Sequence, residues 1–119
     1  MEMNMEFLRK LPTPDDLKQQ FPVSARIAEI KAKRDEEICN IFEGKDDRLL
    51  LVIGPCSADQ EDAVIEYIKR LRKVQDAVSD KIYIVPRIYT NKPRTTGAGY
   101  KGMLHQPEPD RAPDLQAGL

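Results

Sequence analysis

The stretch that decides the fold is "RLLLVIGP", Arg48 to Pro55. Five aliphatic residues follow one another without a break, and Gly54 and Pro55 end the run before it is long enough for a free-standing helix. A short, uninterrupted aliphatic run is typical of a strand in a parallel sheet. We therefore expect a parallel strand that is buried on both faces.

A helix and a second strand are expected next. Asp59 is placed to cap a helix whose apolar residues recur at spacings of three and four. The run "KIYIVPRIY", residues 81–89, is rich in β-branched and aromatic residues and predicts a strand. Pro86 should lie near the strand end or at a bulge, because proline lacks the N–H that a ladder bond needs. The order strand, helix, strand predicts a βαβ unit with parallel strands.

The residues before this unit predict an arm and a helix. Residues 1–23 hold three prolines among polar side chains, which predicts an extended arm with at most one short turn of helix near residues 14–21. Ser24 then suits the N-cap of an amphipathic helix that Gly44 stops. The apolar stripe of this helix has a gap at Arg34.

The residues after the unit are rich in glycine and proline and predict a long loop, residues 90–119, that enters a helix near residues 113–119. We predict two parts, an N-terminal extension of residues 1–45 and the first part of an α/β domain in residues 46–119. A chain of 119 residues is too short for a closed eight-unit α/β barrel, which takes roughly 200 to 250 residues.

Charge and cysteine content restrict the possible partners. Nineteen basic and twenty acidic residues give a net charge of −1, so no overall field attracts nucleic acid or an anionic membrane. No apolar run approaches the length of about 20 residues that spans a bilayer. The first ten residues lack the apolar core of a secretory signal, and two cysteines do not suggest a disulfide framework. We expect a soluble, cytoplasmic protein with reduced thiols.

The stretch "RIYTNKPRTTGAGYKG", residues 87–102, contains four cations and no acidic residue. Guanidinium groups bind carboxylate or phosphate through paired hydrogen bonds, threonines add donors, and glycines let the chain wrap closely around a ligand. The stretch therefore predicts a local site for phosphate or carboxylate groups of a small molecule. A solvated basic loop is the alternative. The residues of interest are Arg87, Lys92, Pro93, Arg94, Thr95, Thr96 and Lys101.

Cys56 follows the first strand and precedes a helix, which makes it a second candidate. Because parallel strands end at the same edge, Cys56 should lie beside the basic stretch. A thiolate stabilised by cations could act as a nucleophile or as a soft metal ligand, and an inert packed thiol is the alternative. A metal site normally needs three or four ligands, and His105, the one histidine, fits a surface loop better than a ligand set. Cys39 fits a structural position in the first long helix.

Two segments carry a family resemblance. "DDRLLLVIGPCS", residues 46–57, and "PRIYTNKPRTTGAGYKGMLHQP", residues 86–107, resemble the amino-terminal part of the microbial class I type of 3-deoxy-D-arabino-heptulosonate 7-phosphate (DAHP) synthase. The resemblance implies a (β/α)₈ TIM barrel, of which this chain holds the first βαβ portion, with residues 1–45 matching an amino-terminal extension.

The resemblance also implies an activity and residue roles. The family joins phosphoenolpyruvate to erythrose 4-phosphate in an aldol-like, metal-dependent condensation, the first step of the shikimate route to aromatic amino acids. The implied roles are metal ligand for Cys56, phosphoenolpyruvate contact for Arg87, catalytic contact between the substrates for Lys92, and erythrose 4-phosphate contacts for Pro93, Arg94, Thr95 and Thr96. The divalent metal would be Mn, Fe, Co or Zn, and the full-length protein is expected to form a homodimer or homotetramer.

Most metal ligands implied by the resemblance are missing from these 119 residues, so we expect this chain alone to be inactive. Two alternatives stay open. A synthase of the related 8-carbon sugar acid shares the barrel and the cysteine, although "KPRTT" argues against it. A truncated, non-catalytic paralogue could instead act as an interaction module that pairs with a full-length synthase.

Overall fold

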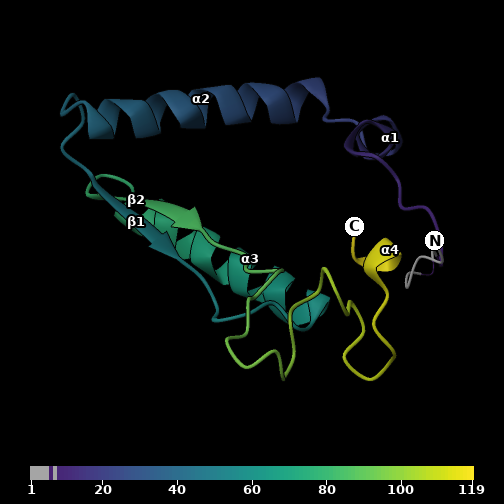
Figure 1. Cartoon of the computed structure of the whole chain (residues 1–119). Coiled ribbons are helices and arrows are strands. Elements are labelled where there is room, and N and C mark those ends of the chain that lie inside the picture. Colours follow the sequence, from purple (N-terminus) through teal and green to yellow (C-terminus); the bar gives the residue numbers. More distant parts are fainter. Residues whose placement is uncertain (1–5, 7) are drawn as a thin grey trace.

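The computed structural model describes residue 6 and residues 8–119, so the first residues of the expected arm, 1–5 and 7, lie outside the described part. Six elements follow one another along the chain (Figure 1). They are α1 (Pro14–Gln20), α2 (Ala25–Phe42), β1 (Leu49–Ile53), α3 (Glu61–Val78), β2 (Ile82–Pro86) and α4 (Leu115–Gly118).

The centre of the molecule is the expected βαβ unit. β1 and β2 pair in parallel, with Leu49 opposite Ile82 and Ile53 opposite Pro86, and α3 connects them and packs on β2. β2 is shorter than the predicted residues 81–89. It ends at Pro86, as its missing N–H predicts, and Arg87 N–H makes the last bond, 2.8 Å long, to the carbonyl of Ile53.

Two local predictions for this unit are wrong. The N-cap of α3 is Gln60 and not Asp59, and its side chain makes no capping hydrogen bond. The segment before α3 is held by a bond from Ala58 N–H to the carbonyl of Tyr89, 3.0 Å long, so the helix begins one residue later than an Asp59 cap would allow.

The second wrong prediction concerns the burial of β1. Leu49 and Val52 are 63% and 58% exposed, although the aliphatic run predicted burial on both faces. In the described chain β1 has one neighbouring strand and contacts α2 at few points, while α3 packs on β2. Buried apolar side chains are therefore few among the described residues: Ala58, Tyr83 and Ile84.

Helix α2 begins and ends where the sequence predicted, and its polar residues bind it to the sheet. The Ser24 side chain caps its first turn, and Gly44, with φ of 71°, follows its end. Arg34, the gap in the apolar stripe, lies 5.1 Å from the centre of the Tyr83 ring and donates a hydrogen bond of 3.0 Å to the carbonyl of Ile84. Arg48 lies 5.0 Å from the same ring. Cations thus enclose Tyr83 between α2 and the sheet.

The arm contains more helix than the sequence predicted. α1 has seven residues instead of one short turn. Thr13 and Asp16 form a reciprocal capping box, and Pro14 occupies the first turn. Proline is tolerated there because a backbone N–H at this position would have no partner within the helix. These two local signals explain the extra turn.

The C-terminal residues form the expected long loop and end in α4, which the Asp114 side chain caps. Asp114 also accepts a hydrogen bond of 2.6 Å from Arg9, so the arm meets α4, and Figure 1 shows α1 and α4 on the same side of the molecule. Across residue 6 and residues 8–119, no helix is both long and apolar enough to cross a membrane.

The molecule is elongated. Its principal extents are 61 × 30 × 27 Å, and its radius of gyration is 18.6 Å, whereas a compact chain of this length has about 13 to 14 Å. Figure 1 shows α2 standing apart from the βαβ unit and joined to it by the connection to β1. The side chain of Arg34 reaches from α2 to β2. This arrangement leaves the carboxyl ends of β1 and β2 accessible.

Candidate anion-binding site

The ends of the two strands approach each other closely because of Gly54. A Cβ atom at this position would lie 1.8 Å from the backbone oxygen of Arg87, closer than any side chain tolerates. Glycine therefore allows the turn after β1 to lie against the chain that leaves β2. This contact brings the loops after both strands to one edge, as the parallel arrangement predicted.

Arg87 is the first cation after β2, and two contacts fix it. Its guanidinium donates a hydrogen bond of 2.7 Å to the carbonyl of Pro55 and lies 5.0 Å from the centre of the Tyr89 ring. The first contact ties Arg87 to the turn after β1, and the second holds the planar group against an aromatic face. A guanidinium held this way has lost much of its rotamer freedom before any ligand arrives.

Lys92 reaches across to the other strand end, where its ammonium group donates a hydrogen bond to the sulfur of Cys56. This contact joins residues 36 positions apart in sequence. It lowers the pKa of the Cys56 thiol, first through the hydrogen bond from Lys92 and then through the Lys92 charge, with smaller contributions from Arg87 and Arg94. Thiolate and ammonium therefore stabilise each other.

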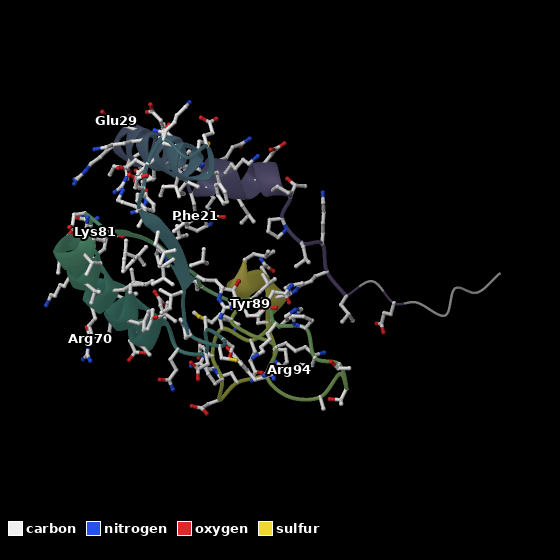
Figure 2. The ribbon with its side chains drawn as sticks, turned by 90° about the vertical axis from the view of Figure 1, so that its left-hand side faces the viewer. Phe21, Glu29, Arg70, Lys81, Tyr89 and Arg94 are labelled. Atoms are coloured by element: carbon white, nitrogen blue, oxygen red, sulfur yellow. The ribbon has the colours of Figure 1, made fainter. Side chains whose placement is uncertain are left out.

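Arg94 is held by its own loop. Its Nε donates to the carbonyl of Tyr100 at 2.8 Å, and the Tyr100 hydroxyl donates to the carbonyl of Gln106 at 2.9 Å. Burial raises the pKa of Tyr100, with a further rise from the negative charge of Asp59, so the hydroxyl stays protonated and remains a donor. Figure 2 shows Arg94 and Tyr89 among the loops near α4.

The loop geometry also uses glycines. Gly102 has φ of 103°, and a Cβ there would lie 2.1 Å from the oxygen of Thr90. The N–H of Lys92 donates to the carbonyl of Lys101 at 2.8 Å. The loop from Lys92 to Lys101, which carries Arg94, is therefore closed at its base.

The structure brings together some of the predicted residues and leaves others apart. Cys56, Arg87 and Lys92 meet at the strand ends, and Arg94 lies near enough for its charge to act on the thiol. Pro93, Thr95 and Thr96 are exposed, and neither threonine side chain makes a hydrogen bond within the described chain. His105 pairs with Asn91 at 2.9 Å, and Cys39 is exposed on α2.

The sequence analysis did not single out the two tyrosines that position the arginines. Tyr89 acts through its ring face and Tyr100 through its backbone oxygen. The available signal was the alternation of aromatic and basic residues between positions 87 and 101.

The site carries excess positive charge. Among residues 8–119, none of the ion pairs involves Arg87, Lys92 or Arg94, although nine other ion pairs are present. The Cys56 thiolate compensates one charge at most, and at least two remain. Fixed, uncompensated cations at one edge favour an anionic ligand.

Replacing Lys92 by methionine is expected to raise the pKa of the Cys56 thiol, because it removes the hydrogen-bond donor and the nearest charge. The thiolate is the reactive form, so alkylation of Cys56 should slow at neutral pH, below the usual thiol pKa of about 8.5. The measurement is the iodoacetamide rate against pH in a Cys39→Ser background. Lys101→Met is the charge-matched control. Equal midpoints for the Lys92 variant and the parent chain would show that Lys92 does not activate the thiol.

The described residues do not form a complete metal site. No group of three or more His, Cys, Asp or Glu side chains with metal-binding spacing occurs in the part of the chain that the structure describes. Cys56 offers one soft donor, and the groups bonded to or stacked near the strand ends are cations, which repel a metal ion. A metal held here would need further donors.

A βαβ unit that gathers fixed cations at the carboxyl edge of its parallel strands is the arrangement by which α/β proteins bind small anionic ligands. The comparisons with known proteins are more specific. The sequence model of the DAHP synthetase I family matches residues 20–118, and the chain belongs to this family, which confirms the resemblance.

The relatives are enzymes. The chain is 40% identical over 109 residues to the phenylalanine-inhibited phospho-2-dehydro-3-deoxyheptonate aldolase of Saccharomyces cerevisiae, covering 92% of the chain and 29% of the relative. It is 41% identical over 109 residues to the Tyr-sensitive enzyme of Escherichia coli, covering 92% and 30%. The solved phospho-2-dehydro-3-deoxyheptonate aldolase of Francisella tularensis superposes with a TM-score of 0.85 at 34% identity, covering 97% of the chain and 33% of that structure. The chain thus spans about a third of the length of these relatives.

Proposed function

We propose that this chain supplies the first part of the substrate site of a DAHP synthase, which condenses phosphoenolpyruvate with erythrose 4-phosphate. The observation that carries the proposal is the convergence of Arg87, Lys92 and Arg94 beside Cys56 at the strand ends, without a carboxylate partner in the described chain. Both substrates are phosphorylated, so bringing them together requires several cations to offset their mutual repulsion. The βαβ unit then forms the beginning of a (β/α)₈ barrel.

We assign the roles from what each side chain offers. Arg87, fixed by Pro55 and Tyr89, presents a planar donor to the phosphate or carboxylate of phosphoenolpyruvate. Lys92, between the strand ends, lies between the two substrates and supplies a compact charge. Pro93, Arg94, Thr95 and Thr96 line the erythrose 4-phosphate side, with exposed threonine hydroxyls free to bond a phosphate.

Cys56 is proposed as one ligand of a divalent metal, Mn, Fe, Co or Zn. Because the described residues do not complete a metal site, we expect the 119-residue chain by itself to bind the anionic substrate without turning it over. We further propose that the longer protein acts as a homo-oligomer.

The experiment is a phosphoenolpyruvate titration of the 119-residue chain, followed by amide chemical shifts. Arg87→Met should weaken binding roughly tenfold to a hundredfold, since a hydrogen bond to a charged group contributes about 1.5 to 3 kcal/mol. Lys101→Met removes an equal charge from the same loop and should weaken binding much less. If both variants lost the same affinity for phosphoenolpyruvate, binding would depend on the overall charge of the loop and not on a defined site.

A turnover assay on the same samples completes this test. Phosphate release from phosphoenolpyruvate, with erythrose 4-phosphate and Mn²⁺ present, should stay at the level of the protein-free blank. Metal-dependent release by this chain would contradict the proposed need for further donors.

A further inference from the structure

The two arginines of the candidate site are held by different tyrosines and by different parts of the chain. Arg87 is held within the βαβ unit. Its N–H donates to the carbonyl of Ile53 at 2.8 Å, and its guanidinium lies 5.0 Å from the centre of the Tyr89 ring. The backbone of Tyr89 is fixed in turn, because its carbonyl accepts the N–H of Ala58, a fully buried residue, at 3.0 Å. The ring therefore stacks on Arg87 from a fixed position.

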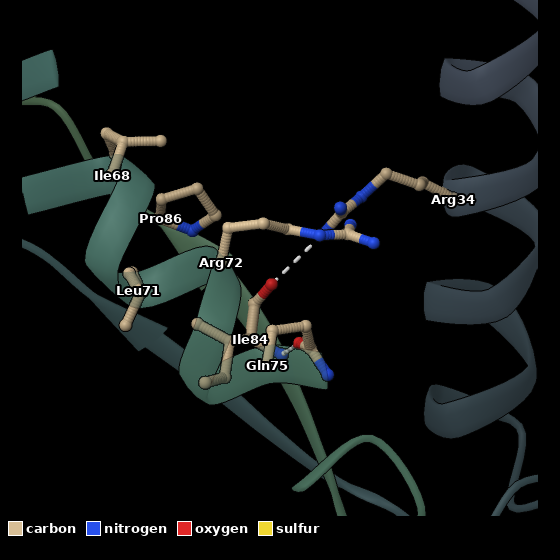
Figure 3. A pocket seen from close by; sticks show the side chains of 7 residues that line it. All are labelled: Arg34, Ile68, Leu71, Arg72, Gln75, Ile84 and Pro86. Atoms are coloured by element: carbon tan, nitrogen blue, oxygen red, sulfur yellow. Dashed lines mark hydrogen bonds between the residues drawn. The ribbon is translucent and has the colours of Figure 1, made fainter. Parts of the chain in front are cut away.

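Arg94 is held inside the loop to which it belongs. Its Nε donates to the carbonyl of Tyr100 at 2.8 Å, and within the described residues its two terminal nitrogens make no hydrogen bond. Arg34, by contrast, donates a terminal nitrogen to the carbonyl of Ile84 and so joins α2 to β2 (Figure 3). Bonding through Nε leaves the forked end of Arg94 available for a phosphate, which a guanidinium binds through paired hydrogen bonds.

The far end of Tyr100 is tied to the residues that follow the loop. Its hydroxyl donates to the backbone carbonyl of Gln106 at 2.9 Å. The side-chain amide of Gln106 in turn donates to the carbonyls of Pro109 and Arg111, each at 2.8 Å. A continuous series of hydrogen-bonded residues thus runs from Arg94 to Arg111 without passing through β1 or β2.

We propose that Tyr89 and Tyr100 are positioning residues that hold two anion subsites independently of each other, Tyr89 through Arg87 and Tyr100 through Arg94. This division rests on the proposed function, in which phosphoenolpyruvate lies at Arg87 and the phosphate of erythrose 4-phosphate lies at Arg94. A guanidinium that is fixed before the ligand arrives loses less rotamer freedom on binding, and this freedom corresponds to about twofold to tenfold in affinity for each side chain. Each tyrosine therefore sets the affinity for one of the two substrates.

Separate titrations of the 119-residue chain with phosphoenolpyruvate and with erythrose 4-phosphate, both without metal, test this division. Tyr89→Leu removes the ring from Arg87 and should weaken phosphoenolpyruvate binding about twofold to tenfold, with a much smaller effect on erythrose 4-phosphate. Tyr100→Phe removes the hydroxyl group that reaches Gln106 and should have the reverse effect. Tyr89→Phe keeps the stacked ring and should restore most of the affinity that Tyr89→Leu loses. If it restored none, the assignment of Tyr89 would be overturned.

Nitrogen relaxation of the arginine Nε–H groups measures the positioning without any ligand. Tyr89→Leu should increase the fast motion of the Arg87 group and leave that of Arg94 as in the parent chain, and Tyr100→Phe should mobilise Arg94 alone. Tyr89→Met takes the place of Tyr89→Leu if circular dichroism shows that the leucine variant has lost helix content.

The two measurements separate a failure of this proposal from a failure of the proposed function. A parent chain that bound neither substrate would contradict the proposed function, and the relaxation of the two arginines would still decide whether the tyrosines position them. Equal changes at both arginines in either variant would overturn the proposal, and so would equal losses of affinity for both substrates.

Discussion

Gly54→Ala is expected to separate the ends of β1 and β2 and to unfold much of the βαβ unit. The added Cβ would lie 1.8 Å from the oxygen of Arg87, and the clashing atom belongs to the backbone, which cannot rotate away as a side chain can. Overpacking typically destabilises by about 1 to 3 kcal/mol, and a backbone clash this close belongs at the upper end of that range. With three buried apolar side chains among the described residues, the chain has little stability to lose. Urea unfolding followed by circular dichroism measures the loss, and amide spectra show whether the strand resonances keep their dispersion.

Gly44→Ala provides the matched control. Gly44, unlike Gly54, has a left-handed φ, 71°, and a Cβ there meets nothing within 4 Å. Its substitution introduces only the strain of a positive φ, on the order of 1 kcal/mol. If the two variants unfolded at the same urea concentration, the close approach of the strand ends would not be what Gly54 provides.

The sequence predicted the elements well because their signals are local. The aliphatic run after Arg48, the β-branched and aromatic residues before Pro86 and the cap at Ser24 each depend on residues close together in sequence. Parallel pairing then follows from the order of the elements, and with it the meeting of Cys56 with the basic stretch. This inference needs only the order of the elements and no knowledge of side-chain contacts.

The burial of individual side chains could not be predicted from local signals. The run from Leu49 to Ile53 has the composition of a buried strand, but exposure depends on which elements cover it, and the run does not specify them. Arg34 looked like a defect in an amphipathic stripe. It instead bonds to β2 and stacks on Tyr83, and this contact involves a residue 49 positions further along the chain.

The residues of the candidate site could also be predicted only in part. Charge and strand-end position identified Arg87, Lys92 and Arg94, whereas Tyr89 and Tyr100 were not identified because a ring face and a backbone carbonyl leave no charge pattern. The roles of Thr95 and Thr96 stay predictions, since they depend on a ligand.

Tyr83→Ala should release α2 from the sheet. The Tyr83 side chain is 4% exposed, lies between the guanidinium groups of Arg34 and Arg48, and donates a hydrogen bond of 3.2 Å to Glu37 on α2. Removing a buried aromatic ring destabilises by about 3 to 5 kcal/mol, and here both cations also lose their stacking partner. Urea unfolding gives the loss in free energy, and amide exchange along α2 should quicken if the helix detaches.

Tyr83→Phe separates the ring from its hydroxyl group. Burial raises the pKa of Tyr83, so the phenol is protonated at neutral pH and serves as the donor to Glu37. Phenylalanine keeps the ring between the arginines and loses only this bond to a carboxylate, which contributes about 1.5 to 3 kcal/mol. Alanine loses the stacked ring as well and must therefore destabilise more than phenylalanine. Equal losses for the two variants would assign the attachment to the hydroxyl group and leave the enclosing cations without a structural role.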